Sequence, residues 1–165
     1  KSAYIAFCDF DDTWKKKKLE TQINFMEKEN IDFSYTAYNV IDENDKILKK
    51  KYFKKKENFK SLLRHCYLGL STVMLKKNLL NRNTNFPSLK TQEDYALWLK
   101  LAQKGTNMKG INQALSSWRK TNDSLSSSIF QKIFDGFKVY NKELNFNIIC
   151  SLFYLFILSI NSILK

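Results

Sequence analysis

Three carboxylates stand within four residues of one another, directly after an apolar run near the start of the chain. The stretch reads YIAFCDFDDTW, and its acidic residues are Asp9, Asp11 and Asp12. Residues 3–8 have the short apolar pattern of a buried strand. If that strand geometry continues, Asp9 and Asp11 point to one side, because side chains alternate along a strand. Paired carboxylates at the carboxyl end of a strand favour a Mg²⁺ or Mn²⁺ site whose shell a phosphate completes.

A purely structural role would also place an acid in this stretch. Asp12 or Thr13 could cap a helix that begins at Trp14, because both side chains accept hydrogen bonds from the first amides of a helix. A cap accounts for one acid and leaves the other two unexplained. The metal-site interpretation is therefore favoured over capping.

A second acidic pair, Glu93 and Asp94, stands at the start of a segment with helical spacing. This helix is predicted over residues 92–103, and Gly105 is expected to end it. Thr91 precedes Asp94 by three positions, which is the spacing of a capping box. On spacing alone, capping is the favoured role for Asp94.

The elements that must position these acids alternate between strand and helix, which predicts an α/β fold. Tyr95, Trp98 and Ala102 share one helical face and are expected in the core. Strands are predicted at residues 3–8, 32–40, 46–53, 71–77 and 110–118, and helices at residues 14–28, 57–65, 92–103 and from 129 to the end.

The chain is strongly basic, with a net charge of +12 and a sequence pI of about 9.6. Lys46–Lys60 alone contains eight Lys and one Glu. Such a charge favours nucleic acid, anionic lipid or phosphorylated substrates. Nucleic acid is the least favoured partner, because the basic run lacks interleaved base-stacking motifs. The three cysteines are far apart and show no disulfide or zinc spacing, which fits a reducing compartment.

Residues 144–164 carry no charged side chain. Their length would span a bilayer, yet polar residues interrupt them. Asn147, Ser151, Tyr154 and Asn161 fall on one helical stripe, so an amphipathic helix that lies in the membrane plane or is docked is favoured. A transmembrane helix and an ordinary core helix are the alternatives.

Two enzyme families resemble the first acidic stretch. Asp9, Asp11 and Thr13 match the D-x-D-x-T motif of haloacid-dehalogenase-like phosphatases, but the glycine-bearing flap of that family is missing. The resemblance to family 2 glycosyltransferases is longer, because five segments follow in family order over most of residues 3–128. The segments are AYIAFCDFDDTWKKKKLETQINFM, FSYTAYNVID, LGLSTVMLKKN, TQEDYALWLKLAQKG and ALSSWRKTNDSLSSS, with Trp118 where Tyr is usual.

The glycosyltransferase resemblance implies a GT-A fold, a mixed sheet with flanking helices, and roles for particular residues. Asp11 would ligate Mn²⁺ or Mg²⁺, and Asp9 would contact the ribose or a metal-bound water. Asp94, with Glu93 beside it, would be the general base of an inverting transfer. Arg119 would hold the diphosphate or form a structural ion pair.

The same resemblance implies a nucleotide-sugar donor, with UDP as the expected nucleotide, and a glycan or lipid-linked acceptor. The expected setting is bacterial surface polysaccharide synthesis, with the protein in the cytoplasm and peripheral on the inner face of the cell membrane. An anionic membrane surface is an expected partner, and nucleic acid is not. A phosphatase with Asp9 as nucleophile and a non-catalytic basic membrane-binding module are the competing functions.

The family begins with an apolar strand, a Thr-Tyr-Asn-type loop and two further βα units before its D-x-D strand, and these hold the nucleotide base. They have no counterpart in this sequence, so it resembles the second part of a GT-A domain. The predicted organisation is a partial glycosyltransferase domain over residues 1–128 and a C-terminal helical segment over residues 129–165.

Overall fold

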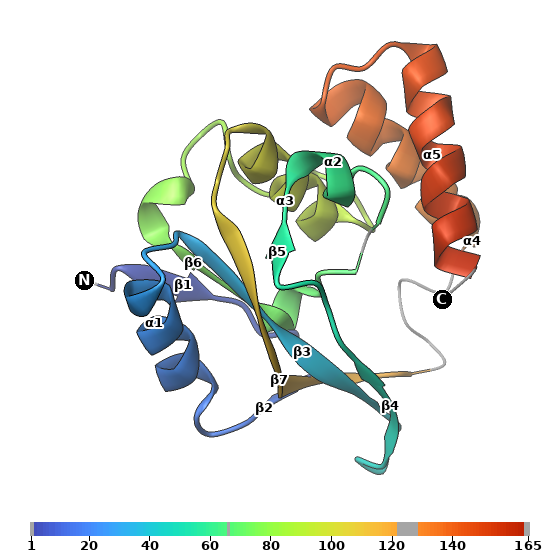
Figure 1. Cartoon of the computed structure of the whole chain (residues 1–165). Helices are drawn as coiled ribbons and strands as arrows, with labels where there is room; N and C mark the ends of the chain where they lie inside the picture. Colours follow the sequence, from blue (N-terminus) through green and yellow to red (C-terminus); the bar gives the residue numbers. More distant parts are fainter. Residues whose placement is uncertain (1, 66, 122–128, 164–165) are drawn as a thin grey trace. The chain divides into compact units, whose positions relative to one another are not determined.

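The computed structural model describes residues 2–65, 67–121 and 129–163, which fall into two compact units (Figure 1). Unit 1 comprises residues 2–57, 68–81 and 106–121. Unit 2 comprises residues 58–65, 67, 82–105 and 129–163. Every strand among the described residues belongs to unit 1.

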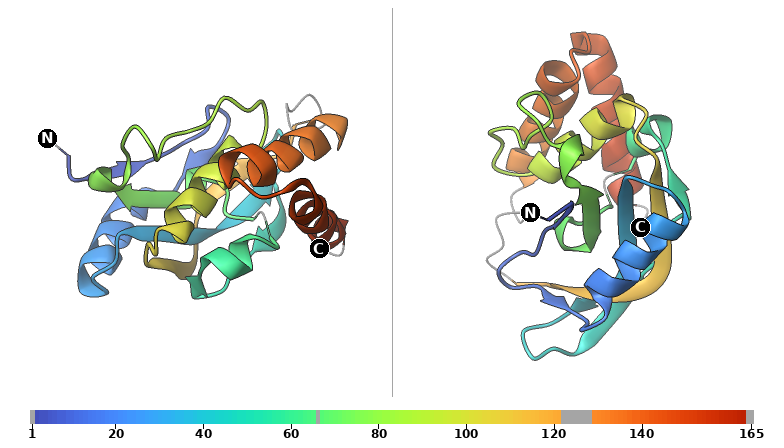
Figure 2. Two further views of the ribbon diagram at one scale, coloured as in Figure 1. Left: turned by 90° about the horizontal axis from the view of Figure 1, so that it is seen from above. Right: turned by 90° about the vertical axis from the view of Figure 1, so that its left-hand side faces the viewer.

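Unit 1 is built on a seven-stranded mixed sheet. Its strand order is β1 (Tyr4–Ala6), β6 (Val73–Lys76), β3 (Phe33–Ile41), β7 (Met108–Arg119) and β2 (Thr13–Trp14), with β4 (Ile47–Lys51) on β3 and β5 (Lys56–Glu57) on β7. The central pair β3–β7 is parallel and the other pairs are antiparallel. The mixed sheet and the flanking helix α1 (Lys18–Lys28), visible in Figure 2, confirm the predicted α/β class.

The central strand β3 is buried along almost its whole length, because both of its faces are covered. Its apolar and β-branched residues suit such a position, and the strand predicted at residues 32–40 is confirmed. On the α1 side, Met26 packs with Ile31 and Met74 in a buried cluster. Two 3₁₀ turns, η1 (Leu70–Thr72) and η2 (Lys77–Leu79), flank β6.

Gly110 allows β7 to run past a buried tyrosine. A Cβ atom at Gly110 would lie 2.4 Å from Cε2 of Tyr35 and 2.9 Å from the main-chain oxygen of Lys54. The Tyr35 hydroxyl donates to that same oxygen at 2.7 Å. Any larger residue at position 110 would therefore displace the hydrogen-bonded ring.

Unit 2 is helical. It contains α2 (Phe59–Leu62), α3 (Glu93–Gln103), α4 (Ile129–Lys138), the π-helix η4 (Val139–Glu143) and α5 (Ile148–Ile163). Gly105, at φ +82°, follows the end of α3 as predicted.

The predicted core face of α3 is confirmed, because Tyr95, Trp98 and Ala102 are all buried. The Tyr95 hydroxyl donates to the main-chain oxygen of Leu62 at 2.6 Å and contacts the Tyr140 hydroxyl at 2.9 Å. These contacts tie α3 to α2 and to η4.

Two predictions about the first residues were wrong. The first strand covers Tyr4–Ala6 rather than residues 3–8, and the following helix begins at Lys18 rather than Trp14. The cause is a long-range pairing: Thr13 and Trp14 form β2, whose partners Ser117 and Ser116 lie on β7. Residues 13–14 are thus extended where local spacing indicated a helix.

The predicted domain boundary at residue 128 lies outside the described residues. Among the described residues, which include most of the uncharged stretch 144–164, no helix is both long enough and apolar enough to cross a bilayer.

Candidate active site

The acidic loop, residues 9–12, follows β1 as a turn rather than as a continued strand. The Asp12 amide donates to the Asp9 main-chain oxygen at 3.2 Å, which closes the turn. The Asp9 amide donates to Oγ of Ser71 at 2.9 Å and so fixes the loop to η1. The side chains of Asp9, Phe10 and Asp11 are exposed. The expected strand alternation therefore does not orient Asp9 and Asp11, and the turn sets their directions instead.

Asp12 is the member of the acidic loop that carries structural contacts. Its Oδ1 accepts from the Arg119 amide at 3.1 Å, and its carboxyl is hydrogen-bonded to the Ser71 side chain. Burial raises the pKa of Asp12, and the nearby Asp9 and Asp11 charges add to this, although the hydrogen bonds oppose it. Asp12 orients the loop. The capping alternative was wrong, because α1 begins at Lys18 and its N-cap, Lys17, makes no side-chain cap bond.

Arg119 connects the acidic loop to the turn between β3 and β4. Its Nε donates to the main-chain oxygen of Asp11 at 3.0 Å, and its Nη1 donates to that of Asp42 at 2.8 Å. Its Nη2 pairs with Asp45 at 2.7 Å. Of the two roles left open for Arg119, the structural ion pair is thus observed, and contact with a diphosphate stays a prediction.

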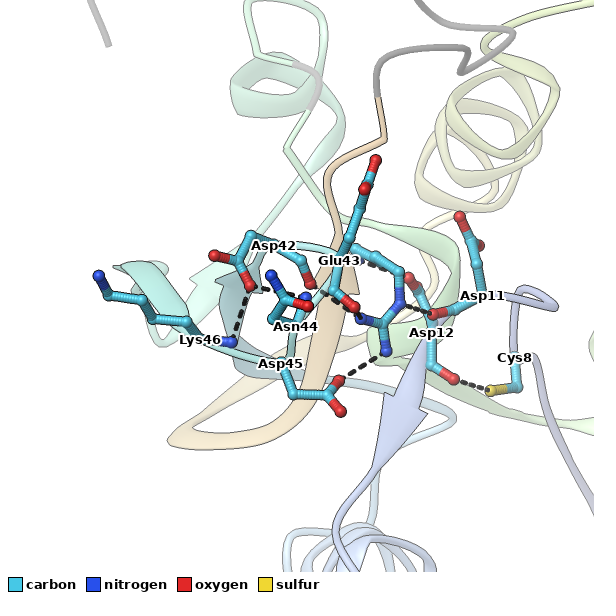
Figure 3. Close-up of polar contacts among 9 residues, drawn as sticks. Cys8, Asp11, Asp12, Asp42, Glu43, Asn44, Asp45 and Lys46 are labelled. Atoms are coloured by element: carbon cyan, nitrogen blue, oxygen red, sulfur yellow. Dashed lines mark hydrogen bonds and ion pairs between the residues drawn. The ribbon is translucent and has the colours of Figure 1, made fainter.

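The β3–β4 turn is shaped by its own aspartate. Oδ1 of Asp42 accepts from the amides of Asn44 and Lys46, both at 2.9 Å (Figure 3). Asp45 has the left-handed value φ +64°, which Asp tolerates better than most residues. The turn therefore presents its main-chain oxygens to Arg119 in a fixed arrangement.

A buried lysine lies beneath this region and was missed by the sequence reasoning. Lys18 is fully buried, its Nζ donates to Oε1 of Gln22 at 2.7 Å, and it lies 4.2 Å from the centroid of a Trp14 ring. Gln22 in turn donates to Ser34 Oγ and to the Thr72 main-chain oxygen, both at 3.1 Å. Burial lowers the pKa of Lys18 to about 8. Residues 15–18 are all lysines, so the sequence does not show which one of them is buried.

Glu93 and Asp94 lie in the first turn of α3, in unit 2. Oδ1 of Asp94 accepts from the Tyr95 amide at 2.6 Å, and both acids are half-buried. The capping box predicted from Thr91 is wrong. Gln92 is the N-cap residue at φ 62°, with no side-chain cap bond, and the Thr91 hydroxyl instead donates to Asp135 at 3.1 Å.

The acidic loop has ligands that suit a divalent cation but too few to enclose one. Asp9 and Asp11 offer exposed carboxylate oxygens, which Mg²⁺ and Mn²⁺ prefer. Within the described residues, no set of three or more His, Cys, Asp or Glu side chains is gathered so that it could hold a metal. Mg²⁺ is commonly bound by one or two carboxylates with substrate phosphates and waters. The loop therefore fits a cation whose shell a diphosphate would complete.

Comparisons with known proteins agree with the resemblance seen in the sequence. The family description "Glycosyl transferase family 2" matches residues 1–85. The Escherichia coli protein WfaP, named UDP-Glc:alpha-D-GlcNAc-diphosphoundecaprenol beta-1,3-glucosyltransferase, is 32% identical over 169 residues, which cover 100% of this chain and 64% of WfaP. WfgD, an E. coli protein of the same description, is 39% identical over 132 residues, 79% of this chain and 51% of WfgD. The chain thus spans between half and two thirds of these relatives.

Among solved structures, S. aureus TarS (residues 1–349, in complex with UDP-GlcNAc) superposes with a TM-score of 0.65 at 16% identity. The superposition covers 94% of this chain and 47% of TarS. This similarity shows the fold, and the GT-A expectation is confirmed. Together with the family match, it leaves the phosphatase alternative without support. The chain belongs to glycosyl transferase family 2.

Proposed function

We propose that the protein transfers a sugar from a UDP-sugar to a lipid-linked acceptor, with inversion and with a divalent cation, during bacterial surface polysaccharide synthesis. One observation carries the proposal. The main chain of the acidic loop is held by Ser71 and Arg119, while the carboxylates of Asp9 and Asp11 stay exposed. A loop whose main chain is held while the side chains of Asp9 and Asp11 are exposed is suited to receive a cation.

The substrate classes in this proposal come from the relatives. WfaP and WfgD are named as enzymes that use UDP-Glc and a GlcNAc-diphosphoundecaprenol acceptor, and the solved TarS structure contains UDP-GlcNAc. We propose a donor and an acceptor of the same chemical classes for this protein. The proposal leaves the sugar and the linkage open.

Asp11 and Asp9 are proposed to hold Mg²⁺ or Mn²⁺. When bound, the cation would neutralise the charge that develops on the leaving diphosphate. Arg119 keeps the loop in place through its main-chain contacts. Nη2 of Arg119 carries a second N–H besides the one that pairs with Asp45, and a direct contact with the diphosphate would use that donor.

Asp94 is proposed as the general base that accepts the proton of the attacking hydroxyl, and Glu93 as its neighbour. Its carboxylate is half-buried and is already oriented by the Tyr95 amide. Such a group contributes about 10²–10⁴ to the rate when it is correctly placed.

The proposal is tested in the full-length protein with Asp11→Asn and with Asp32→Asn as the matched control. Asp32 forms a surface ion pair with Lys76 at 2.8 Å and lies outside the acidic loop. UDP release from a panel of UDP-sugars is measured with a diphosphate-linked GlcNAc lipid as acceptor. Asp11→Asn should abolish Mn²⁺- or Mg²⁺-dependent release, while Asp32→Asn should retain it.

Full turnover in the presence of a chelator, or in Asp11→Asn, would refute the cation site. A non-catalytic basic module predicts no turnover in either variant or in the wild type. Labelling of Asp9 by beryllium fluoride would restore the phosphatase alternative.

A further inference from the structure

Helix α5 has the opposite orientation to that of an ordinary surface helix, because its polar stripe faces the rest of unit 2. Ser151 is fully buried, and the Asn161 side chain donates to the main-chain oxygen of Arg64 at 3.0 Å. The ring of Tyr154 stacks on the ring of Tyr140, with 5.7 Å between the two ring centroids. The stripe that the sequence singled out is therefore used for packing within unit 2.

The opposite side of α5 is apolar and exposed. Ile149 is 80% exposed and Phe156 is 65% exposed. Steps of three, four and seven residues keep most of the exposed side chains on one face of a helix. The exposed apolar residues of α5 are Ile148, Ile149, Leu152, Phe153, Phe156 and Ile160.

Helix α4 has a similar outward face, formed by Ile129, Phe130, Ile133 and Phe134. Its inward side carries Asp135, which is 1% exposed and accepts from the Thr91 amide at 3.0 Å.

Glycine at position 136 brings α4 close to α5. A Cβ atom at Gly136 would lie 2.9 Å from Cδ1 of Leu155, so a larger residue there would have to displace the Leu155 side chain. The two helices, seen together in Figure 1, thus pack as parts of the same unit.

The charges around the outward faces are positive. Lys132 and Lys138 of α4 are half-buried, and Nζ of Lys138 lies 4.0 Å from the centroid of the Phe134 ring. The two acids of the described residues 129–163 are both engaged: Asp135 accepts from Thr91, and Glu143 pairs with Lys100. The outward faces therefore combine apolar side chains with lysines and no exposed acid.

We propose that the outward faces of α4 and α5 insert into one leaflet of an anionic lipid bilayer. An α-helix rises about 1.5 Å per residue, so the 16 residues of α5 are shorter than the hydrocarbon core of about 30 Å and suit a helix that lies in the membrane plane. Lysines beside an exposed apolar helix face, such as Lys132 and Lys138, are typical of helices that lie on an anionic membrane. The attachment at the inner face of the cell membrane, expected from the sequence, would then be made by these two helices.

The test uses the full-length protein and sedimentation with vesicles of phosphatidylcholine, with and without phosphatidylglycerol. Ile149→Glu/Phe156→Glu places two charges on the outward face of α5. The matched control is Ile47→Glu/Leu48→Glu, because these residues on β4 are 51% and 52% exposed and lie in the basic run. Circular dichroism verifies that each variant is folded.

The wild type and the control should partition onto vesicles, more strongly with phosphatidylglycerol and less strongly at high salt. The α5 variant should lose at least about tenfold in partition coefficient, since interfacial binding scales with the apolar area inserted. Lys132→Gln/Lys138→Gln should weaken binding to the anionic vesicles only.

Equal binding of the α5 variant and the wild type would overturn the proposal, as would loss of binding in the β4 control alone. If the wild type ignores vesicles and sediments as a dimer that Ile149→Glu/Phe156→Glu dissociates, the face is an interface between copies. If the wild type is a monomer that does not bind vesicles, another segment of the protein covers the outward faces of α4 and α5. Either result overturns the lipid proposal.

Discussion

Replacement of Arg119 by lysine tests whether the guanidinium holds the acidic loop against the β3–β4 turn. The side chain donates to the main-chain oxygens of Asp11 and Asp42 at 3.0 and 2.8 Å. Hydrogen bonds of a charged donor contribute about 1.5–3 kcal/mol each. The pair with Asp45 adds less than about 1 kcal/mol, because the Asp45 side chain is 73% exposed.

We expect Arg119→Lys to lower the free energy of unfolding by about 2 kcal/mol, because lysine keeps the charge but lacks the planar fork that reaches both carbonyls. The matched control, Asp45→Asn, should cost less than about 1 kcal/mol. Urea unfolding gives the global value. Amide hydrogen exchange at residues 9–12 and 42–46 reports whether the two segments open locally.

The positioning role also predicts a functional signature in the full-length protein. A loosened acidic loop should raise the half-saturating Mn²⁺ concentration in Arg119→Lys more than in Asp45→Asn. Equal costs for the two variants would show that the ion pair is the main contact. Unchanged exchange at residues 9–12 in Arg119→Lys would refute the reasoning.

Three further variants have defined outcomes. Asp94→Asn should lower the chemical rate by about 10² or more with donor binding retained, whereas an equal loss of thermal stability and no loss per folded molecule would indicate a structural role. Burial lowers the pKa of Lys18 in the folded protein to about 8, so between about pH 8 and 10.5 the unfolded chain binds more protons than the folded one. The free energy of unfolding of the wild type should therefore rise by about 3 kcal/mol across this window. Lys18→Met should remove this rise, which urea unfolding at several pH values measures. Burial acts to raise the pKa of Asp135, but hydrogen bonds from Gln131 and Thr91 outweigh it and lower that pKa. The contribution of Asp135 to the free energy of unfolding should therefore be lost as the pH falls below about 4. Asp135→Asn should reduce this loss of stability at acid pH, as followed by circular dichroism.

The sequence predicted those elements whose signals are local. The central strand β3 was recognised from its run of aromatic and β-branched residues. Helix α3 was recognised from its apolar spacing and from Gly105, which takes the positive φ that ends the helix. The residue pattern that identifies each element lies within a short window of the chain, so both could be recognised without knowledge of their distant partners.

The wrong predictions concern residues whose conformation depends on contacts with distant segments of the chain. Trp14 has helical spacing with the residues that follow, yet it pairs with Ser116, about a hundred positions away, and its indole donates to Ser71. Arg119 finds Asp42 and Asp45 across a similarly long separation. No local pattern carries these pairings.

The polarity of α5 and the burial of Lys18 could not be deduced from residue type. The polar stripe predicted an amphipathic helix, but residue type alone did not show that Ser151 and Asn161 would make contacts within unit 2. Lys18 lies among three exposed lysines, and only the partner Gln22, one helical turn later, distinguishes it. A Lys-x-x-x-Gln spacing at the start of a helix is a weak signal that such a buried pair exists.

The contacts of the acidic loop explain how a short chain segment can keep three carboxylates together. Ser71 accepts from the Asp9 amide, its side chain is hydrogen-bonded to Asp12, and its main-chain oxygen accepts from the Trp14 indole. These bonds use the main chain of the loop and the one half-buried acid. Burial, together with the neighbouring charges, still raises the pKa of Asp12. The remaining repulsion falls on Asp9 and Asp11, which face solvent. A bound cation would relieve that repulsion, which supports the cation site proposed for Asp9 and Asp11.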